Sequence, residues 1–241
     1  MVGILSDIGN VRAKNEDCTD YYEDNLKGIY VIADGMGGYN CGEIASSIAV
    51  NEMLEYIKGV ENFENIELIM KQAIKKANKK IYKASLENEE QKGMGTTLTA
   101  CLIYNGELIV GHVGDSSCYV IMDNKINKLT KDHSLVQELI DSGSITEAEA
   151  LSHPNKNIIT RALGTSDYVE VDVYKQPLNG IDKIILCTDG VSNFVLTDEM
   201  YEVITNNDNM VACKKLIELG KEKGSRDNLS VIVFEGEGKK W

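Results

Sequence analysis

The chain has 241 residues, and its 25 lysines and arginines against 38 aspartates and glutamates give a formal net charge of −13 at pH 7. This acidic balance argues against a nucleic-acid-binding protein, because phosphate backbones bind to basic surfaces. A share of 43% hydrophobic and 26% charged residues is typical of a folded protein. No apolar run approaches the ~20 residues that would span a bilayer, so we expect no insertion in a membrane.

The first half of the chain contains four short β-branched runs and two longer segments with helical periodicity. Strands are expected, in chain order, at residues 3–6, 28–33, 96–104 and 107–113. Asn105-Gly106 lies between the last two runs and is a strong signal for a two-residue hairpin, so these strands should pair antiparallel. Helices are expected at 43–57 and 67–84, because apolar residues recur there with helical spacing and share one face.

The second half of the chain supplies four more expected strands, at residues 118–122, 168–174, 183–188 and 229–234. Helices are expected at 135–141, at a short turn that Thr146 and Glu149 open as a capping box, and at 198–204 and 211–221. Helices thus occur as an early pair and a late pair between groups of largely antiparallel strands. This order predicts an α+β fold, a sandwich of sheets with helices outside, rather than a regular βαβ alternation.

One domain over residues 1–241 is expected, because no internal repeat, low-complexity tract or linker rich in proline and serine divides the chain. The six cysteines lie far apart and never form a CxxC pair, so they are expected to be reduced thiols. The N-terminal segment lacks the basic stretch followed by an apolar one that a signal peptide has. These features predict a cytoplasmic protein.

Three of the expected strands lead to an aspartate beside a glycine. Asp34 and Asp189 each follow an apolar run and precede a glycine, and Asp115 follows an apolar run and a glycine. Glycine lets the backbone turn and approach a ligand closely. A single Asp-Gly pair is more often only a turn, but three such pairs after apolar strands indicate a common site at the rim of a sheet.

Two further acidic stretches are similar, Asn15-Glu16-Asp17 and Arg226-Asp227-Asn228. Carboxylates gathered at the rims of buried strands repel one another unless cations neutralise them. Because only oxygen ligands are expected to converge, the predicted ion is hard, namely Mg²⁺, Mn²⁺ or Ca²⁺. An acidic site with two such metals is a common arrangement for activating water against a phosphate ester.

The motifs around these residues resemble those of the metal-dependent Ser/Thr protein phosphatases of type 2C. They follow one another in the order that the family shows, from residue 6 to residue 234, so the resemblance covers essentially the whole chain. The compact length and the Asp-Gly-Met-Gly-Gly form are similar to the bacterial branch. The matching segments are Ser6-Asp7-Ile8-Gly9, Arg12-Ala13-Lys14-Asn15-Glu16-Asp17, Ala33-Asp34-Gly35-Met36-Gly37-Gly38, Gly95-Thr96-Thr97, Val113-Gly114-Asp115-Ser116, Thr130-Lys131-Asp132-His133-Ser134, Ile159-Thr160-Arg161-Ala162-Leu163-Gly164, Cys187-Thr188-Asp189-Gly190 and Arg226-Asp227-Asn228-Leu229-Ser230.

The resemblance implies a four-layer α/β/β/α sandwich, in which two central, mostly antiparallel sheets are flanked by helices. This agrees with the order of elements above. It also implies metal-dependent hydrolysis of phosphoserine and phosphothreonine in proteins, with two Mn²⁺ or Mg²⁺ ions as cofactors. A water held between the two metals would attack phosphorus in line, without a covalent phosphoenzyme. Bacterial members of the family hold a third, weaker metal.

The resemblance further implies which residues hold the first two metals. Asp34 would bridge both metals, and Asp189 and Asp227 would complete the first metal site. Glu16 and the backbone carbonyl of Gly35 would serve the second metal, in part through water. These five residues are therefore the expected metal ligands.

Three more positions match functional residues of the family. Asp17 matches an acidic position that supports the metal shell, and Asp115 matches a ligand of the third metal. Arg12 matches the arginine that binds the phosphate, and its planar fork suits two phosphate oxygens better than lysine would. Two positions depart from the family, because Ser117 stands where members commonly carry arginine and Met36 stands where eukaryotic members carry histidine.

Residues 134–157 correspond to a segment that forms a mobile flap beside the active site in the family. His133 and His153 flank this segment. The segment could act as a gate for the substrate, or it could be an ordinary surface loop whose histidines form hydrogen bonds. Direct catalysis by either histidine is disfavoured.

The expected partners are phosphoproteins and a cognate Ser/Thr kinase of the same bacterial cell, whose action a monomeric enzyme would oppose. An alternative is a catalytically silent metal- or phosphoprotein-binding regulatory module of the same fold. Asp34, Asp189, Asp227 and Arg12 argue against this alternative, because a silent relative tends to lose at least one of them.

Overall fold

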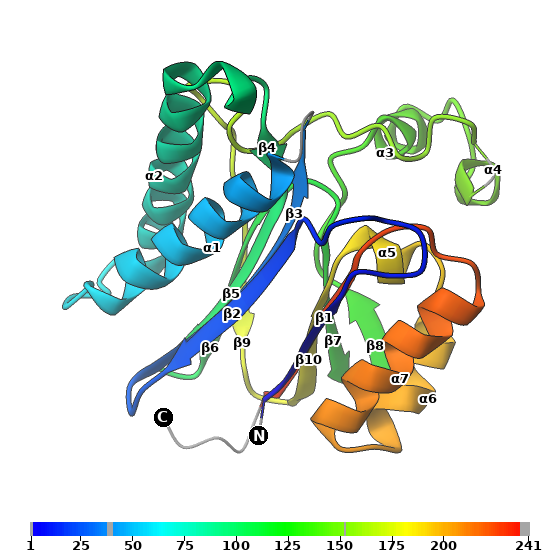
Figure 1. Cartoon of the computed structure of the whole chain (residues 1–241). Coiled ribbons are helices and arrows are strands. Elements are labelled where there is room, and N and C mark those ends of the chain that lie inside the picture. The colour runs from blue at the N-terminus through cyan, green and yellow to red at the C-terminus, as the bar shows by residue number, and fades with distance from the viewer. Residues whose placement is uncertain (1, 38–40, 152, 237–241) are drawn as a thin grey trace.

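The computed structural model describes residues 2–37, 41–151 and 153–236. Two antiparallel sheets pack face to face, and helices cover both outer faces (Figure 1). The first sheet has the strand order β1 (Gly3–Asp7), β11 (Leu229–Glu235), β10 (Ile181–Cys187), β7 (Ser117–Met122) and β8 (Lys125–Lys128). The second has the order β2 (Asp17–Glu23), β3 (Lys27–Met36), β5 (Leu98–Tyr104), β6 (Glu107–Val113) and β9 (Asp172–Pro177), with β4 (Gly95–Thr96) paired to β3.

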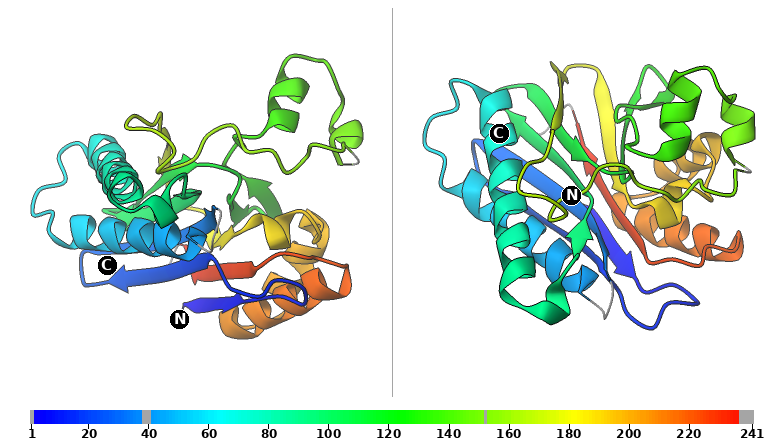
Figure 2. Two further views of the ribbon diagram at one scale, coloured as in Figure 1. Left: turned by 45° about the horizontal axis from the view of Figure 1, so that its top comes forward. Right: turned by 90° about the horizontal axis from the view of Figure 1, so that it is seen from above.

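The helices fall into two pairs and a projecting group. Helices α1 (Gly42–Lys58) and α2 (Ile66–Glu87) pack on the second sheet, with the short 3₁₀ helix η2 (Glu89–Gln91) after them, and α6 (Thr197–Thr205) and α7 (Asn209–Glu222) pack on the first. The four-residue α5 (Asp189–Ser192) follows β10. Helices α3 (Leu135–Asp141) and α4 (Glu147–Leu151) project from the layered body (Figure 2). No helix in the described ranges is both long and apolar enough to cross a membrane.

Strict alternation along the central strands produces the layers. In β3, Ile29 and Val31 point towards α1 and α2, whereas Tyr30 and Ile32 point towards the other sheet. The Tyr30 ring stacks on Phe234 of β11, with ring centroids 3.5 Å apart. Three apolar layers therefore separate the four layers of secondary structure, and the predicted α/β/β/α sandwich is confirmed.

The predicted hairpin and capping box are both present. Asn105 and Gly106 have φ values of +49° and +74°, which the turn between β5 and β6 requires. Thr146 and Glu149 exchange hydrogen bonds at the start of α4, where the Thr146 amide donates to the Glu149 carboxylate over 2.8 Å. Local sequence alone determines both features.

Several expected elements differ from the observed ones. The strand expected at 168–174 begins only at Asp172 and ends at Pro177, because it pairs with β6 from His112 back to Glu107. The run expected at 96–104 is divided into β4 and β5 at Thr97. Strands β2 and β8 are polar strands at the edges of their sheets, so neither shows the apolar alternation that predicts a strand.

Candidate active site

One end of the sandwich collects the acidic residues that the sequence singled out. Strands β3, β6 and β10 bring Asp34, Asp115 and Asp189 to this end, and Asp227 lies there two residues before the start of β11. A cavity of about 330 Å³ opens there. Its lining includes Arg12, Glu16, Asp34, Gly35, Asp115, Asp189 and Asp227. The expected ligand residues and the expected phosphate-binding arginine, which lie up to 215 positions apart in the chain, therefore meet at one site.

Two threonines fix the backbone of Asp34. Its amide donates to Thr97 Oγ1 over 2.9 Å, and Thr96 Oγ1 donates to its carbonyl oxygen over 2.9 Å. Thr97 Oγ1 also lies 2.7 Å from Ser116 Oγ, beside Asp115. The Gly-Thr-Thr segment thus holds the ends of β3 and β6 together. This role was not evident in the sequence, although the segment belongs to the matching motifs.

Glu16 is held where β3 meets the start of α1. Its carbonyl accepts from the Gly35 amide over 3.1 Å and from Ser46 Oγ over 2.6 Å. Its Oε1 accepts from the Gly42 amide over 3.2 Å. A Cβ on Gly35 would lie 2.1 Å from the Gly42 carbonyl oxygen, so only glycine allows this close approach. The Asp-Gly pair at the end of β3 is therefore required by packing as well as by the site.

Asp17 lies behind the cavity wall rather than in the lining of the cavity. Its Oδ2 accepts from Thr188 Oγ1 over 2.9 Å and from Ser230 Oγ over 2.7 Å. These contacts tie β2 in one sheet to β10 and β11 in the other. The position suits a residue that supports the acidic cluster from behind.

Burial and mutual repulsion disfavour negative charge in this cluster. Burial raises the pKa of Asp34 well above its usual range, and the neighbouring Asp17 and Asp189 raise it further. Burial also raises the pKa of Asp17 to about 7 and that of Asp115 to about 8. Within the described chain, Asp17 Oδ1, Asp115 Oδ1 and Asp189 Oδ1 are buried without a hydrogen-bond partner. Orphaned buried carboxylate oxygens of this kind fit a divalent cation, which would satisfy and neutralise them.

The carboxylates surround the cavity but are not gathered around one point. No group of three or more His, Cys, Asp or Glu side chains in the described ranges is arranged to hold a metal ion as it stands. One of these carboxylates already has a cationic partner, because Arg12 Nη2 donates to Asp227 Oδ2 over 2.8 Å. A bound cation would compete with Arg12 for the Asp227 carboxylate.

His133 holds the loop that carries Asp115. The Gly114 amide donates to His133 Nδ1 over 2.9 Å, and the His133 amide donates to the Gly114 carbonyl over 2.8 Å. His133 Nε2 in turn lies 3.1 Å from Asp172 Oδ2 and 2.9 Å from Arg161 Nη1. These contacts position the loop although Ser117, and not arginine, stands two residues after Asp115.

The expected flap segment meets the cavity at its C-terminal end. Residues 133–135 pair with 158–160, for example where the Thr160 amide donates to the His133 carbonyl over 2.8 Å, and this pairing closes the root of the segment. Asn157 and Ile159 line the cavity, and the sequence did not single them out. His153 does not line the cavity. Residue 152 within this segment, and Gly38 of the glycine-rich motif, lie outside the described residues.

A family model described as protein phosphatase 2C matches residues 10–223 of the chain. The chain is 35% identical over 235 residues to the serine/threonine phosphatase stp of Listeria welshimeri, and the match covers 95% of this chain and 93% of the relative. It is 31% identical over 236 residues to the protein phosphatase PhpP of Streptococcus pneumoniae, with 96% of each chain covered. The family match therefore spans every lining residue of the cavity except Asp227, which follows its last matched residue.

Solved structures are similar over the same span. The serine/threonine phosphatase Stp1 of Staphylococcus aureus has a TM-score of 0.92 at 33% identity, with 98% of this chain and 95% of that chain covered. The catalytic domain of the serine threonine protein phosphatase PstP, in complex with two manganese ions, has a TM-score of 0.86 at 32% identity, with 97% and 96% covered. The four-layer arrangement is thus shared with these proteins.

Proposed function

The chain belongs to the protein phosphatase 2C family, and on this premise we propose how its residues act. It is a metal-dependent hydrolase of phosphoserine and phosphothreonine in proteins. One observation carries the proposal for its site. Carboxylates from four separate strand ends and Arg12 line one cavity. Within the described residues, one buried carboxylate oxygen each of Asp17, Asp115 and Asp189 has no hydrogen-bond partner, and a bound metal could satisfy these oxygens.

Two ions are proposed to bind in this cavity, in line with the complex of the PstP catalytic domain with two manganese ions. Asp34 would contact both ions, Asp189 and Asp227 would complete one site, and Glu16 and the Gly35 carbonyl would serve the other. When bound, the ions supply the Lewis acidity that activates water for in-line attack on phosphorus. The chain's own part is to hold these oxygens at fixed positions, which the threonine contacts to Asp34 support.

Asp115 is proposed as a ligand of a third, weaker site, since it lines the same cavity with one oxygen unpaired. Asp17 would support the cluster from behind through Thr188 and Ser230. Manganese or magnesium would serve at these positions, because all the donors are oxygens. Any cation bound here would also lower the repulsion that raises the pKa values of Asp34 and Asp115.

Arg12 is proposed to bind the phosphate of the substrate. Its guanidinium is half exposed at the edge of the cavity, and its present partner is Asp227. If Asp227 served as a metal ligand, the Arg12 guanidinium would be available to two phosphate oxygens. It would then orient the phosphate and stabilise negative charge that develops during attack.

The substrates are phosphoproteins. From the resemblance and the sequence we propose a partner, a Ser/Thr kinase whose products this enzyme dephosphorylates. We also propose a monomeric state, a cytoplasmic location, one domain over residues 1–241 and a flap at 134–157. The alternative of a catalytically silent module is less well supported. The complete set of Asp34, Asp189, Asp227 and Arg12 lines one cavity, which a silent module would not need.

The test uses protein stripped of metal and then titrated with Mn²⁺, Mg²⁺ or Ca²⁺. Phosphate release is measured from phosphothreonine, phosphoserine and phosphotyrosine peptides of the same sequence. The proposal predicts Mn²⁺-dependent release from the first two peptides. Folded protein that releases no phosphate with any of the three metals would instead support the silent module.

A further inference from the structure

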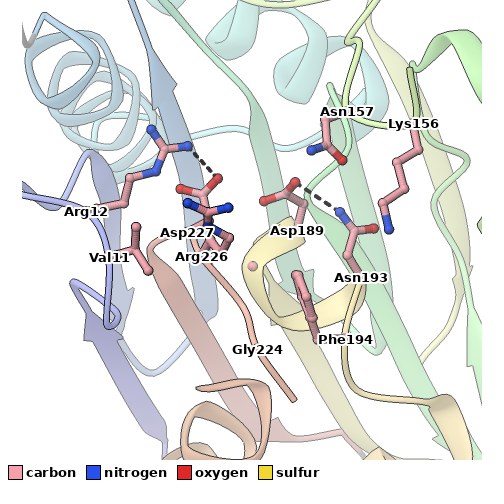
Figure 3. A pocket seen from close by; sticks show the side chains of 11 residues that line it. Val11, Arg12, Lys156, Asn157, Asp189, Asn193, Phe194, Gly224, Arg226 and Asp227 are labelled. Atoms are coloured by element: carbon pink, nitrogen blue, oxygen red, sulfur yellow. Dashed lines mark hydrogen bonds and ion pairs between the residues drawn. The ribbon is translucent and has the colours of Figure 1, made fainter. Parts of the chain in front are cut away.

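A second hollow adjoins the carboxylate cavity and has a volume of about 480 Å³ (Figure 3). The two hollows share Arg12, Asp189 and Asp227, so they form neighbouring parts of one depression. The far side of this hollow is formed by residues that the proposed chemistry does not use. They include Val11, Lys156, Asn193, Phe194 and Arg226.

Basic side chains reach this hollow from three distant parts of the chain. Arg12 comes from the loop between β1 and β2, Lys156 from the segment between α4 and β9, and Arg226 from the loop between α7 and β11. In Figure 3, Arg12 and Arg226 lie on the left of Asp189, and Lys156 lies on its right. The chain has only three arginines and a net charge of −13, yet two of these arginines line this hollow. These three cations line the hollow together with two carboxylates, Asp189 and Asp227, and the resulting excess of positive charge indicates a site for an anionic group.

Arg226 is presented to this hollow by a well-defined turn. The Ser225 amide donates to the Gly220 carbonyl over 3.0 Å, and Gly224 has a φ value of +89° that closes the end of α7. The Arg226 side chain is exposed and, within the described residues, forms no ion pair. Arg12, by contrast, is paired with Asp227. Arg226 is therefore the guanidinium that an incoming anion meets without displacing a partner.

The remaining wall combines an amide and an apolar surface. Asn193 donates from Nδ2 to Asp189 Oδ2 over 3.1 Å, which fixes it beside the carboxylate cavity. Phe194 and Val11 give the hollow apolar sides, and Val11 is 54% exposed. A hollow with cations, an amide and apolar contacts suits a peptide segment better than a free inorganic ion.

We propose that this hollow binds a second anionic side chain of the substrate, close in sequence to the phosphorylated residue. Arg226 and Lys156 would contact the carboxylate of an aspartate or glutamate, or a second phosphate, while Arg12 and the metal site hold the phosphate that is cleaved. The two hollows adjoin, and an extended peptide advances only about 3.3 Å per residue, so neighbouring residues of one peptide can occupy both. This proposal rests on the proposed function of the carboxylate cavity.

The test compares the selectivity of variants and not their absolute activity. Three phosphothreonine peptides are used, in which the neighbouring residues are glutamine, glutamate or phosphoserine. For each enzyme the ratio of kcat/KM for each acidic peptide to that for the glutamine peptide is measured with saturating Mn²⁺. The enzymes are the wild type, Arg226→Gln, Lys156→Gln and, as a matched control, Lys79→Gln, which removes an exposed cation from α2.

The wild type should prefer an acidic peptide by roughly threefold to tenfold, as expected for a charge-assisted contact at a partly exposed site. Arg226→Gln and Lys156→Gln should bring the ratio close to one, whereas Lys79→Gln should keep the wild-type ratio. The glutamate and phosphoserine arms show which anion is preferred. A wild-type ratio near one, or an unchanged ratio in Arg226→Gln, would overturn the proposal. If no peptide is hydrolysed at all, the proposed function fails and not only this inference.

Discussion

Asp17 stands directly opposite Asp34 in the antiparallel register of β2 and β3, so two carboxylates from adjacent strands occupy one end of the sandwich. Burial raises the pKa of both carboxyls, and the negative charge of Asp17 raises the pKa of Asp34 further. Two hydroxyl groups, from Thr188 and Ser230, stabilise the Asp17 carboxylate from behind. Among the residues that the structure describes, its other oxygen has no hydrogen-bond partner. The pair is thus arranged so that a cation would stabilise both charges.

Replacing Asp17 by asparagine should weaken metal binding while preserving the fold. The amide carbonyl can still accept from Thr188 and Ser230, and one negative charge is removed from the cluster. Supporting residues of a metal site typically contribute tenfold to hundredfold in metal affinity. We therefore expect the Mn²⁺ concentration for half-maximal activity to rise by about that factor, with no loss of thermal stability in the stripped protein. An unchanged Mn²⁺ requirement would show that Asp17 has only a packing role.

Arg12→Ala should reduce catalysis through loss of phosphate binding and not through loss of metal. A charge-assisted hydrogen bond contributes about 1.5–3 kcal/mol, which corresponds to a fall in kcat/KM of roughly tenfold to hundredfold. Because Arg12 also pairs with Asp227, its removal frees that carboxylate, and the Mn²⁺ requirement should fall or stay the same. Arg12→Lys should recover only part of the activity, since lysine lacks the planar fork. A higher Mn²⁺ requirement in Arg12→Ala would contradict this assignment.

His133→Ala should displace the loop that carries Asp115. The substitution leaves the buried Gly114 amide without the ring nitrogen that it donates to, and such a loss costs about 1–3 kcal/mol. We expect a higher Mn²⁺ requirement and a lower melting temperature. His153→Ala is the matched control, because His153 lies near the other end of the flap segment and outside the cavity lining. If the two variants had the same Mn²⁺ requirement as the wild type, His133 would not position Asp115.

Removal of metal should make the stability of the protein depend on pH with a defined sign. Burial raises the pKa of Asp17 to about 7 and that of Asp115 to about 8, from an ordinary value of 3.8. Between the ordinary and the raised values, the folded state therefore holds more protons than the unfolded state. The stabilisation is present at low pH and is lost as the pH rises through these folded-state values. The melting temperature of stripped protein should therefore fall between pH 6.5 and 8.5.

The same experiment with Mn²⁺ provides the control. The metal stabilises the ionised carboxylates and competes with protons, so it should raise the melting temperature more at pH 8.5 than at pH 6.5. The pH range begins at 6.5 so that His112 does not contribute. Burial lowers the pKa of His112 from 6.5 to about 3, so this residue destabilises the folded state only below pH 6.5. An Mn²⁺-induced shift that is larger at pH 6.5 would contradict the raised pKa values.

The sequence was sufficient to predict the layers and most of the cavity. A continuous apolar run in segments such as 29–33 and 184–187 is a strong signal, because each face of these strands is buried in a different core. Asp34, Asp115 and Asp189 were recognisable because they follow such runs beside glycine. Their neighbourhood in space then follows from strand pairing and the family resemblance.

Other features depend on contacts that no local pattern records. The polar edge strand β2 carries Asp17 to its place opposite Asp34, but its sequence lacks apolar alternation. Asn228 ties the N-terminal loop to the site by donating to the Ile8 and Lys14 carbonyls over 2.9 Å each, and its role depends on residues more than 200 positions away. The pairing of Arg12 with Asp227 is of the same kind. These contacts could be found only once the chain was folded.

We propose that Asp34 holds the metal on which hydrolysis depends. The most direct measurement is phosphate release from a phosphothreonine peptide by Asp34→Asn over a full Mn²⁺ titration, beside the wild type and Asp182→Asn, which removes an exposed carboxylate outside the cavity lining. We predict that Asp34→Asn remains folded, gains no thermal stability from Mn²⁺ and releases no phosphate at any Mn²⁺ concentration. We also predict that Asp182→Asn behaves as the wild type does. Turnover by Asp34→Asn at the wild-type rate and with the wild-type Mn²⁺ requirement would show that Asp34 does not hold the metal needed for hydrolysis.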